Sequence, residues 1–172
     1  MNIRGVRFRP ATPEDRAMLE VWDRDLAVFN SDPDDSWDWE RELAHDPDWR
    51  EQLVAMEGER PIGFVQIIDP EFEETQYWGP MASGFRAIDI WIGAAEDRNR
   101  GCGTAMMQLA LHRCFASPEV QTVLIDPLLT NTAAQRFYRR LGFKEVGRRQ
   151  FDDSDCLVFQ LDRSGWEDTL EP

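Results

Sequence analysis

One short glycine-bearing segment limits most strongly what this chain can fold into: Arg98-Asn99-Arg100-Gly101-Cys102-Gly103-Thr104. The run from Ala87 to Ile92 before it has the character of a strand, and the run from Ala105 to Phe115 after it that of a helix. Gly101 and Gly103 allow the backbone to approach a ligand closely, and the amides in a helix's first turn lack partners within the helix. The segment therefore predicts an anion-binding turn, and a pyrophosphate is its most obvious occupant.

Spacing separates three kinds of phosphate-binding loop. A Walker loop requires a lysine before Thr104 and glycines that lie further apart, so it is excluded. The dinucleotide-binding fingerprint requires a small residue at the position of Met106, so it fits poorly. The pattern that fits is Arg98-x-x-Gly101-x-Gly103, which resembles the acyl-CoA pyrophosphate loop of the GNAT superfamily of N-acetyltransferases.

A second motif follows downstream, in the order that this superfamily has. The GNAT helix with the pattern Asn-x-x-Ala-x-x-x-Tyr-x-x-x-Gly-Phe resembles the segment Asn131-Thr132-Ala133-Ala134-Gln135-Arg136-Phe137-Tyr138-Arg139-Arg140-Leu141-Gly142-Phe143. The resemblance implies that Asn131 and Ala134 contact acetyl-CoA and that Tyr138 lies near its sulfur. It also implies that the Arg98–Thr104 turn binds the pyrophosphate of acetyl-CoA, and that backbone amides near Trp91 and Ile92 polarise the thioester carbonyl.

Shorter segments narrow the resemblance further. The aminoglycoside 6′-N-acetyltransferases contain segments similar to Arg86-Ala87-Ile88-Asp89, Gly101-Cys102-Gly103-Thr104 and Ile125-Asp126-Pro127. The similarity extends from about Pro61 to Leu161. It implies the GNAT fold, a mixed and mostly antiparallel sheet that is splayed at its middle strands and has helices on both faces. The segment Tyr77-Trp78-Gly79-Pro80 departs from the family, which has a paired-tryptophan acidic run there.

Length and composition limit the remaining expectations. A chain of 172 residues fits a single domain, with a tail after about Asp162 that we expect to fray. Three cysteines without a Cys-x-x-Cys pair predict a reduced, cytoplasmic protein, and no stretch predicts a signal peptide or a membrane span. The net charge of −14 disfavours nucleic acid and anionic membranes and favours a cationic amine as partner, with solubility alone as an equal explanation of the charge. The expected assembly is a monomer or a homodimer.

The hydrophobic pattern predicts interspersed strands and helices of the α/β (α+β) class. A helix is expected to begin after Thr12 and to run to about Val28, and another begins after Asn131 and stops at Gly142. The other expected helices are 37–44 and 105–115, the expected strands are 6–9, 52–56, 61–68, 85–93, 120–125, 143–146 and 157–161, and the expected loops are 30–35, 69–84 and 147–155.

The central carboxylate of the predicted site is Asp89. It alternates with isoleucines along its strand, so Asp89 and Trp91 face the side opposite Ile88, Ile90 and Ile92. The family resemblance gives Asp89 a contact with the substrate amine, whereas the pattern alone is that of an exposed charge on a sheet face. A carboxyl of ordinary pKa, ~3.9, is a weak base for an amine of pKa ~8, a gap of roughly 5 kcal/mol. Asp89 is therefore expected to hold the ammonium and to pass its proton to water.

The remaining candidates each have two interpretations. Asp126, before Pro127, either binds a second cationic group or forms a turn. Tyr138 lies on the apolar face of its helix, where the pattern alone indicates core packing and the family motif implies a general acid. Acidic and aromatic residues either form a pocket for a polycationic sugar or are a solvated face and core tryptophans. These residues are Asp34, Asp35, Trp37, Asp38, Trp39, Glu73, Glu74, Tyr77 and Trp78. His45 and His112 lack the spacing of metal ligands, so no metal site is expected.

The resemblance thus implies an acetyl-CoA-dependent N-acetyltransferase that acts on a primary amine of a cationic small molecule. The leading acceptor is the 6′-amine of an aminoglycoside, which would attack directly in a ternary complex. Two alternatives stay open. One is a GNAT enzyme for another amine, such as a siderophore precursor, a polyamine or a protein amino terminus. The other is a GNAT-like module that binds acyl-CoA without turnover.

Overall fold

The computed structural model describes residues 1–25, 28 and 37–170, and it divides into two compact units. Unit 1 consists of Met1–Ile67 and Asp89–Ala110, and unit 2 of Ile68–Ile88 and Leu111–Pro172. The predicted anion-binding turn and Asp89 thus belong to unit 1, whereas Asp126, Asn131 and Tyr138 belong to unit 2.

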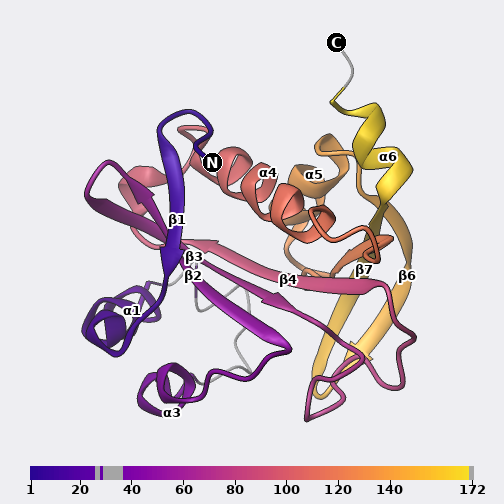
Figure 1. Ribbon diagram of the computed structural model, residues 1–172, viewed down its shortest axis with the longest axis horizontal. Coiled ribbons are helices and arrows are strands. Elements are labelled where there is room, and N and C mark those ends of the chain that lie inside the picture. Colours follow the sequence, from indigo (N-terminus) through magenta and orange to yellow (C-terminus); the bar gives the residue numbers. More distant parts are fainter. Residues whose placement is uncertain (26–27, 29–36, 171–172) are drawn as a thin grey trace. The chain divides into compact units, whose positions relative to one another are not determined.

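Unit 1 starts with a strand and a helix, as its first residues predict. Its elements are β1 (Val6–Pro10), the 3₁₀ segment η1 (Pro13–Asp15), α1 (Arg16–Trp22), α3 (Trp39–Ala44), β2 (Arg50–Glu57), β3 (Arg60–Ile68), the second half of β4 (Phe85–Ile92), the 3₁₀ segment η2 (Ala95–Asp97) and most of α4 (Cys102–Phe115) (Figure 1). The predicted hairpin is β2 and β3, and Gly58 in its turn is left-handed with φ +62°.

The core of unit 1 requires a glycine where three elements meet. A Cβ atom on Gly63 of β3 would lie 2.5 Å from the carbonyl oxygen of Trp91 and 2.6 Å from Cε of Met106. Because β4 and α4 approach β3 this closely, no larger residue fits at position 63. The neighbouring Phe64 is fully buried beside Trp39 and Leu19.

Unit 2 contains the first half of β4 and the end of α4. Its other elements are β5 (Thr122–Ile125), α5 (Thr132–Arg140), β6 (Lys144–Phe151), β7 (Ser154–Asp162) and α6 (Arg163–Asp168) (Figure 1). One core cluster of this unit packs Trp78, Leu124, Phe151, Cys156 and Val158. The loop before β4 is therefore held to the unit by Trp78, which is 6% exposed.

The strand order is β1-β2-β3-β4-β5-β7-β6. β4 and β5 are parallel, and the pairs β1–β2, β5–β7 and β6–β7 are antiparallel. The predicted mixed, mostly antiparallel sheet is confirmed. Among the described residues, no helix has the length and apolar character needed to cross a membrane.

The end of the first helix differs from the sequence prediction. α1 ends at Trp22 and residues 23–25 form a turn and a bend, so the helix expected to run to about Val28 is interrupted after Trp22, and Val28 itself is helical. Residues 26–27 and 29–36 lie outside the described residues, which removes the predicted loop 30–35 and the candidates Asp34 and Asp35 from the comparison.

The predicted loop 147–155 is largely strand. β6 continues to Phe151 because it pairs along its length with β7, from Lys144 opposite Gln160 to Phe151 opposite Ser154. β6 is the last strand in the sheet order, and most of its side chains are exposed. An edge strand with solvent on both faces has no apolar alternation, which is why the sequence pattern resembles a loop.

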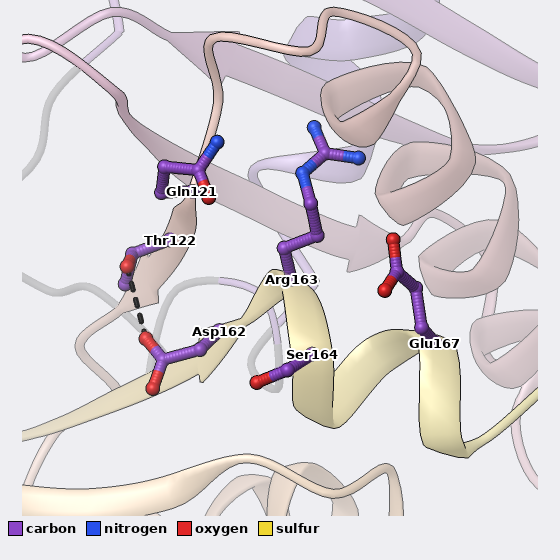
Figure 2. Close-up of a pocket in the computed structure, with 6 residues that line it drawn as sticks. All are labelled: Gln121, Thr122, Asp162, Arg163, Ser164 and Glu167. Atoms are coloured by element: carbon purple, nitrogen blue, oxygen red, sulfur yellow. Dashed lines mark hydrogen bonds between the residues drawn. The ribbon is translucent and has the colours of Figure 1, made fainter.

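The tail that was expected to fray forms α6. Arg163 at its start donates hydrogen bonds to the carbonyl oxygens of Phe115 (3.0 Å), Ser117 (2.6 Å) and Val120 (2.7 and 3.0 Å). Figure 2 shows this side chain extending from the first turn of α6. The ring of Trp166 also stacks on Phe115 at 4.8 Å between centroids. The carbonyls of Phe115, the last residue of α4, and of the loop after it thus bind the tail, an interaction between distant segments that the sequence pattern does not report.

Candidate active site

The glycine-bearing turn has the backbone geometry of an anion site. α4 begins at Cys102, and the turn before it is left-handed at Asn99 (φ +60°) and Gly101 (φ +86°). The first hydrogen bond of the helix runs from the amide of Ala105 to the carbonyl of Gly101. The amides before Ala105 begin a helix of 14 residues and have no acceptor in a preceding turn. They are suited to bind an anion at the positive end of the helix dipole.

The arginine side chains of this turn bind carboxylates of unit 1. Arg98 pairs with Asp25 at 2.5 Å, and Arg100 pairs with Asp97 at 2.7 Å and with Glu57 at 3.5 Å. The family resemblance implies that Arg98 and Arg100 contact the pyrophosphate. Their ion pairs fix the turn, which makes the backbone amides the groups best suited to bind an anion there.

Asp97 is a site residue that the sequence analysis missed. It is 1% exposed, and Arg60 of β3 binds both of its oxygens at 2.7 Å. The hydrogen bonds from Arg60, reinforced by the charge of Arg100, hold the pKa of Asp97 below its ordinary value. A buried carboxylate four residues before Gly101 thus connects the turn to β3. The signal in the sequence is an acid next to two arginines, which by itself resembles a solvated charge cluster.

Asp97→Asn is expected to lower the free energy of unfolding at pH 7 by about 1–2 kcal/mol, because it removes the charged acceptor of two arginines. A carboxyl whose pKa is lowered in the folded state stabilises it above the unfolded pKa of ~3.9 and loses this contribution as the pH falls through the folded pKa. The difference between wild type and variant should therefore shrink below about pH 4. Urea unfolding at several pH values measures it, with the exposed Asp153→Asn as control. A difference that does not change with pH would contradict the assignment.

Asp89 lies on an aromatic face of unit 1. It is half-buried on β4, and Gln66 of β3 donates a hydrogen bond to its Oδ2 at 2.9 Å. Two residues along β4, the ring of Trp91 packs 4.8 Å from Phe64 and 5.7 Å from Trp37. Trp91 therefore shares this face with Asp89, as the alternation predicts. Among the described residues, the indole nitrogen of Trp91 is the single buried side-chain nitrogen or oxygen without a hydrogen-bond partner.

The candidate Trp39 is a core residue rather than a surface ring. It is 1% exposed, stacks on Trp37 at 4.9 Å, and donates its indole N–H to Asp23 at 2.5 Å. Burial raises the pKa of Asp23 above its ordinary value. The neighbouring Asp38 is exposed and caps α3 by accepting a hydrogen bond from the amide of Arg41 at 3.3 Å. The structure thus supports the core interpretation of Trp39 and gives Asp38 a local structural role.

In unit 2, Asp126 accepts a hydrogen bond from the hydroxyl of Tyr77 at 2.7 Å. The Tyr77 ring stacks on Phe151 with 4.3 Å between centroids, and Arg149 lies over the Phe151 ring at 4.6 Å. The candidate Trp78 is buried in the core of unit 2, which is the core interpretation again. The 69–84 segment therefore contacts Asp126 through its tyrosine.

The two glutamates of the same segment, Glu73 and Glu74, differ in their surroundings. Glu73 accepts hydrogen bonds from the amides of Thr75 at 2.7 Å and Tyr77 at 2.8 Å, so in this structure it shapes the segment itself. Glu74 is exposed. Glu73 therefore places Tyr77, whereas Glu74 stays a candidate for binding a cation.

Asn131 and Tyr138 have structural roles at the start and on the buried side of α5. Asn131 caps α5 by accepting a hydrogen bond from the amide of Ala134 at 3.1 Å. Tyr138 is 7% exposed and packs against Phe137, Phe143 and Phe159. The core packing of Tyr138 agrees with the interpretation from the residue pattern, and its role as an acid stays a prediction.

The hollow in Figure 2 contains none of the predicted site residues. It has a volume of about 300 Å³ and is lined by Gln121, Thr122, Asp162, Arg163, Ser164 and Glu167. Arg163 is bound to backbone carbonyls, and Asp162 accepts a hydrogen bond from Thr122 at 2.9 Å. We assign no catalytic role to it.

Residues 12–151 match the family model described as the acetyltransferase (GNAT) domain. The chain belongs to the GNAT acetyltransferase family. The matched span includes every predicted site residue, and it extends over parts of both units.

Known relatives and structures place this GNAT chain more closely. Aminoglycoside N(6′)-acetyltransferase type 1 of Klebsiella pneumoniae is 27% identical over 117 residues, which are 67% of this chain and 58% of that relative. The chain therefore spans less than two thirds of the length of that relative. The kanamycin resistance protein of Rhizobium radiobacter is 29% identical over 98 residues, 56% of this chain and 91% of that relative. The crystal structure of aminoglycoside acetyltransferase AAC(6′)-Ib with coenzyme A and kanamycin has a TM-score of 0.86 at 25% identity, covering 96% of this chain and 99% of that one.

Proposed function

We propose that this GNAT protein transfers the acetyl group of acetyl-CoA to a primary amine of an aminoglycoside, with the 6′-amine as the leading position. The observation that carries the proposal is that two features occur together in unit 1. One is a glycine turn at the amino terminus of α4, and the other is a half-buried carboxylate, Asp89, on an aromatic strand face. The first suits a pyrophosphate and the second an ammonium group beside a sugar. The resemblance to aminoglycoside acetyltransferases supports the same pairing.

The residues of the turn fit the diphosphate of acetyl-CoA. The left-handed backbone at Gly101 opens the approach, and the amides of Cys102, Gly103 and Thr104 supply donors without a preceding helical turn. Acetyl-CoA supplies the acetyl group as a thioester, which an uncharged amine attacks without a covalent enzyme intermediate. Arg98 and Arg100 hold the turn through their carboxylate partners.

The acceptor amine is held by carboxylates. In this proposal Asp89 binds the ammonium form, orients it and passes its proton to water, after which the neutral amine reacts. Asp126, with its Tyr77 partner, is a second carboxylate that binds an ammonium group. Tyr138 gives a proton to the departing thiolate as general acid. The charge of −14 favours a polycationic substrate over an anionic one.

The test is thiol release from acetyl-CoA with matched acceptors. Neomycin and paromomycin differ at the 6′ carbon, where the first has an amine and the second a hydroxyl group. We expect release with kanamycin and neomycin and at most a few per cent of that rate with paromomycin. Equal rates with neomycin and paromomycin would mean that an amine other than the 6′-amine is acetylated. Release with spermidine alone would replace the aminoglycoside by a polyamine, and acetyl-CoA binding without release would leave a binding module.

Tyr77→Phe is expected to raise the KM for kanamycin by about 3–10-fold, since it removes one hydrogen bond that orients Asp126. The ring and its stacking on Phe151 are kept, so the midpoint of thermal unfolding should change little. Steady-state kinetics and a thermal melt measure the two effects. An unchanged KM would show that Asp126 does not bind the acceptor through this geometry.

A further inference from the structure

Two glutamine side chains connect Asp89 to the rest of the unit 1 sheet. Gln66 of β3 donates through Nε2 to Asp89 at 2.9 Å, and its Oε1 accepts a hydrogen bond from Nε2 of Gln52 at 3.1 Å. The three residues come from β2, β3 and β4, which are consecutive in the strand order. We call Gln52, Gln66 and Asp89 the amide row.

The amide row shares a face with the aromatic residues of the strand. Phe64 of β3 contacts Trp91 of β4. Gln66, two residues after Phe64, contacts Asp89, two residues before Trp91. Steps of two residues in opposite directions keep the side chains on one face of an antiparallel pair. Gln66 is therefore fixed next to a packed aromatic pair, and it is 4% exposed.

The hydrogen-bond partners of the buried Gln66 amide determine which of its two ends faces Asp89. A buried amide group without a partner is costly, and both ends of this one are paired. Because an ionised carboxylate only accepts hydrogen bonds, the N–H group of Gln66 is the end that points at Asp89, and its Oε1 accepts from Gln52. The donor that Asp89 receives from β3 is therefore neutral.

We propose that Gln66 is a positioning residue that orients the Asp89 carboxylate toward the acceptor ammonium through a neutral hydrogen bond. The inference rests on the proposed function, because it requires that Asp89 binds the amine. An arginine or lysine at position 66 would also orient the carboxylate, but it would compete with the ammonium for the same negative charge. A glutamine orients the carboxylate and adds no positive charge of its own.

Gln66→Met tests the role, since methionine has a similar length and no donor. We expect kcat/KM for kanamycin to fall about 10-fold through KM, with the KM for acetyl-CoA unchanged. In an Asp89→Ala background the same substitution should change kcat/KM by less than about 2-fold, because the group it positions is gone. Gln52→Met should have a smaller effect in the same direction. The control is Gln108→Met on the exposed side of α4, which should leave kinetics unchanged. An equal fall in both backgrounds would overturn the positioning role.

A measurement without substrate separates this inference from the proposed function. The side-chain amide signals of Gln66, assigned by their loss in Gln66→Met, should show slow hydrogen exchange in the wild-type protein. In Asp89→Ala they should shift and exchange faster. Unchanged signals would overturn the amide row itself. Shifted signals in a protein that releases no thiol with any amine would support the hydrogen bond and reject the proposed function.

Discussion

Asp89→Asn is expected to lower kcat/KM for kanamycin by about 100-fold or more. The substitution keeps the shape of the side chain and an oxygen that can accept the Gln66 hydrogen bond, but it removes the charge that binds the ammonium in the proposed function. Truncating one member of a desolvated charge pair costs about 2–5 kcal/mol, and ~3 kcal/mol corresponds to a loss of roughly 150-fold. Steady-state kinetics with acceptor and acetyl-CoA varied separately measure the effect, which should spare the KM for acetyl-CoA.

The control for charge alone is Asp153→Asn, an equal change of formal charge in the exposed turn between β6 and β7. It should leave kcat/KM within about 2-fold, because an exposed charge is screened by salt. A similar loss in both variants would mean that net charge attracts the substrate and that Asp89 does not bind it. A change of less than 2-fold in Asp89→Asn would remove Asp89 from the acceptor site.

Tyr138→Phe is expected to lower kcat by about 100-fold while both KM values stay within about 2-fold. The reason is that general acid catalysis acts in the transition state, whereas binding uses other groups. Tyr138 is packed among Phe137, Phe143 and Phe159, so phenylalanine fits the same space and folding should be retained. Rapid measurement of thiol release under saturating substrates gives kcat directly.

The chain contains two tyrosines, which supplies a matched comparison. Tyr77→Phe removes the other phenolic hydroxyl, and its effect should appear in KM for the acceptor, while that of Tyr138→Phe appears in kcat. An unchanged kcat in Tyr138→Phe would mean that Tyr138 is a core residue and not a general acid. Equal effects of both variants on one parameter would contradict the separate roles.

The sequence predicts the local features of this fold well, because they depend on local physics. A glycine turn between a strand and a helix, the capping by Asn131 and the alternation of Asp89 with isoleucines all depend on neighbouring residues. Each appears in the structure where the pattern places it. The family motifs add the order of the elements, and the mostly antiparallel sheet agrees with them.

Features that depend on contacts between distant segments could not be predicted from the sequence pattern. Trp39 and Trp78 lie in acidic, polar stretches, and only packing against Phe64 or Phe151 shows that they are core residues. The partner of Asp97 is 37 residues away in the chain, and that of Asp126 is 49 residues away. A pattern of local spacing has no information about such pairs.

The internal ion pairs of the glycine turn have a consequence for how the ligands arrive. Because Arg98 and Arg100 are neutralised by carboxylates of the same unit, the turn presents amide dipoles rather than free positive charge. Amide dipoles attract over short distances only, whereas a chain of net charge −14 repels a polyphosphate over a Debye length of about 8–10 Å. Added salt should therefore speed the encounter with acetyl-CoA and slow that with a polycationic acceptor, so the two substrates respond to ionic strength in opposite directions.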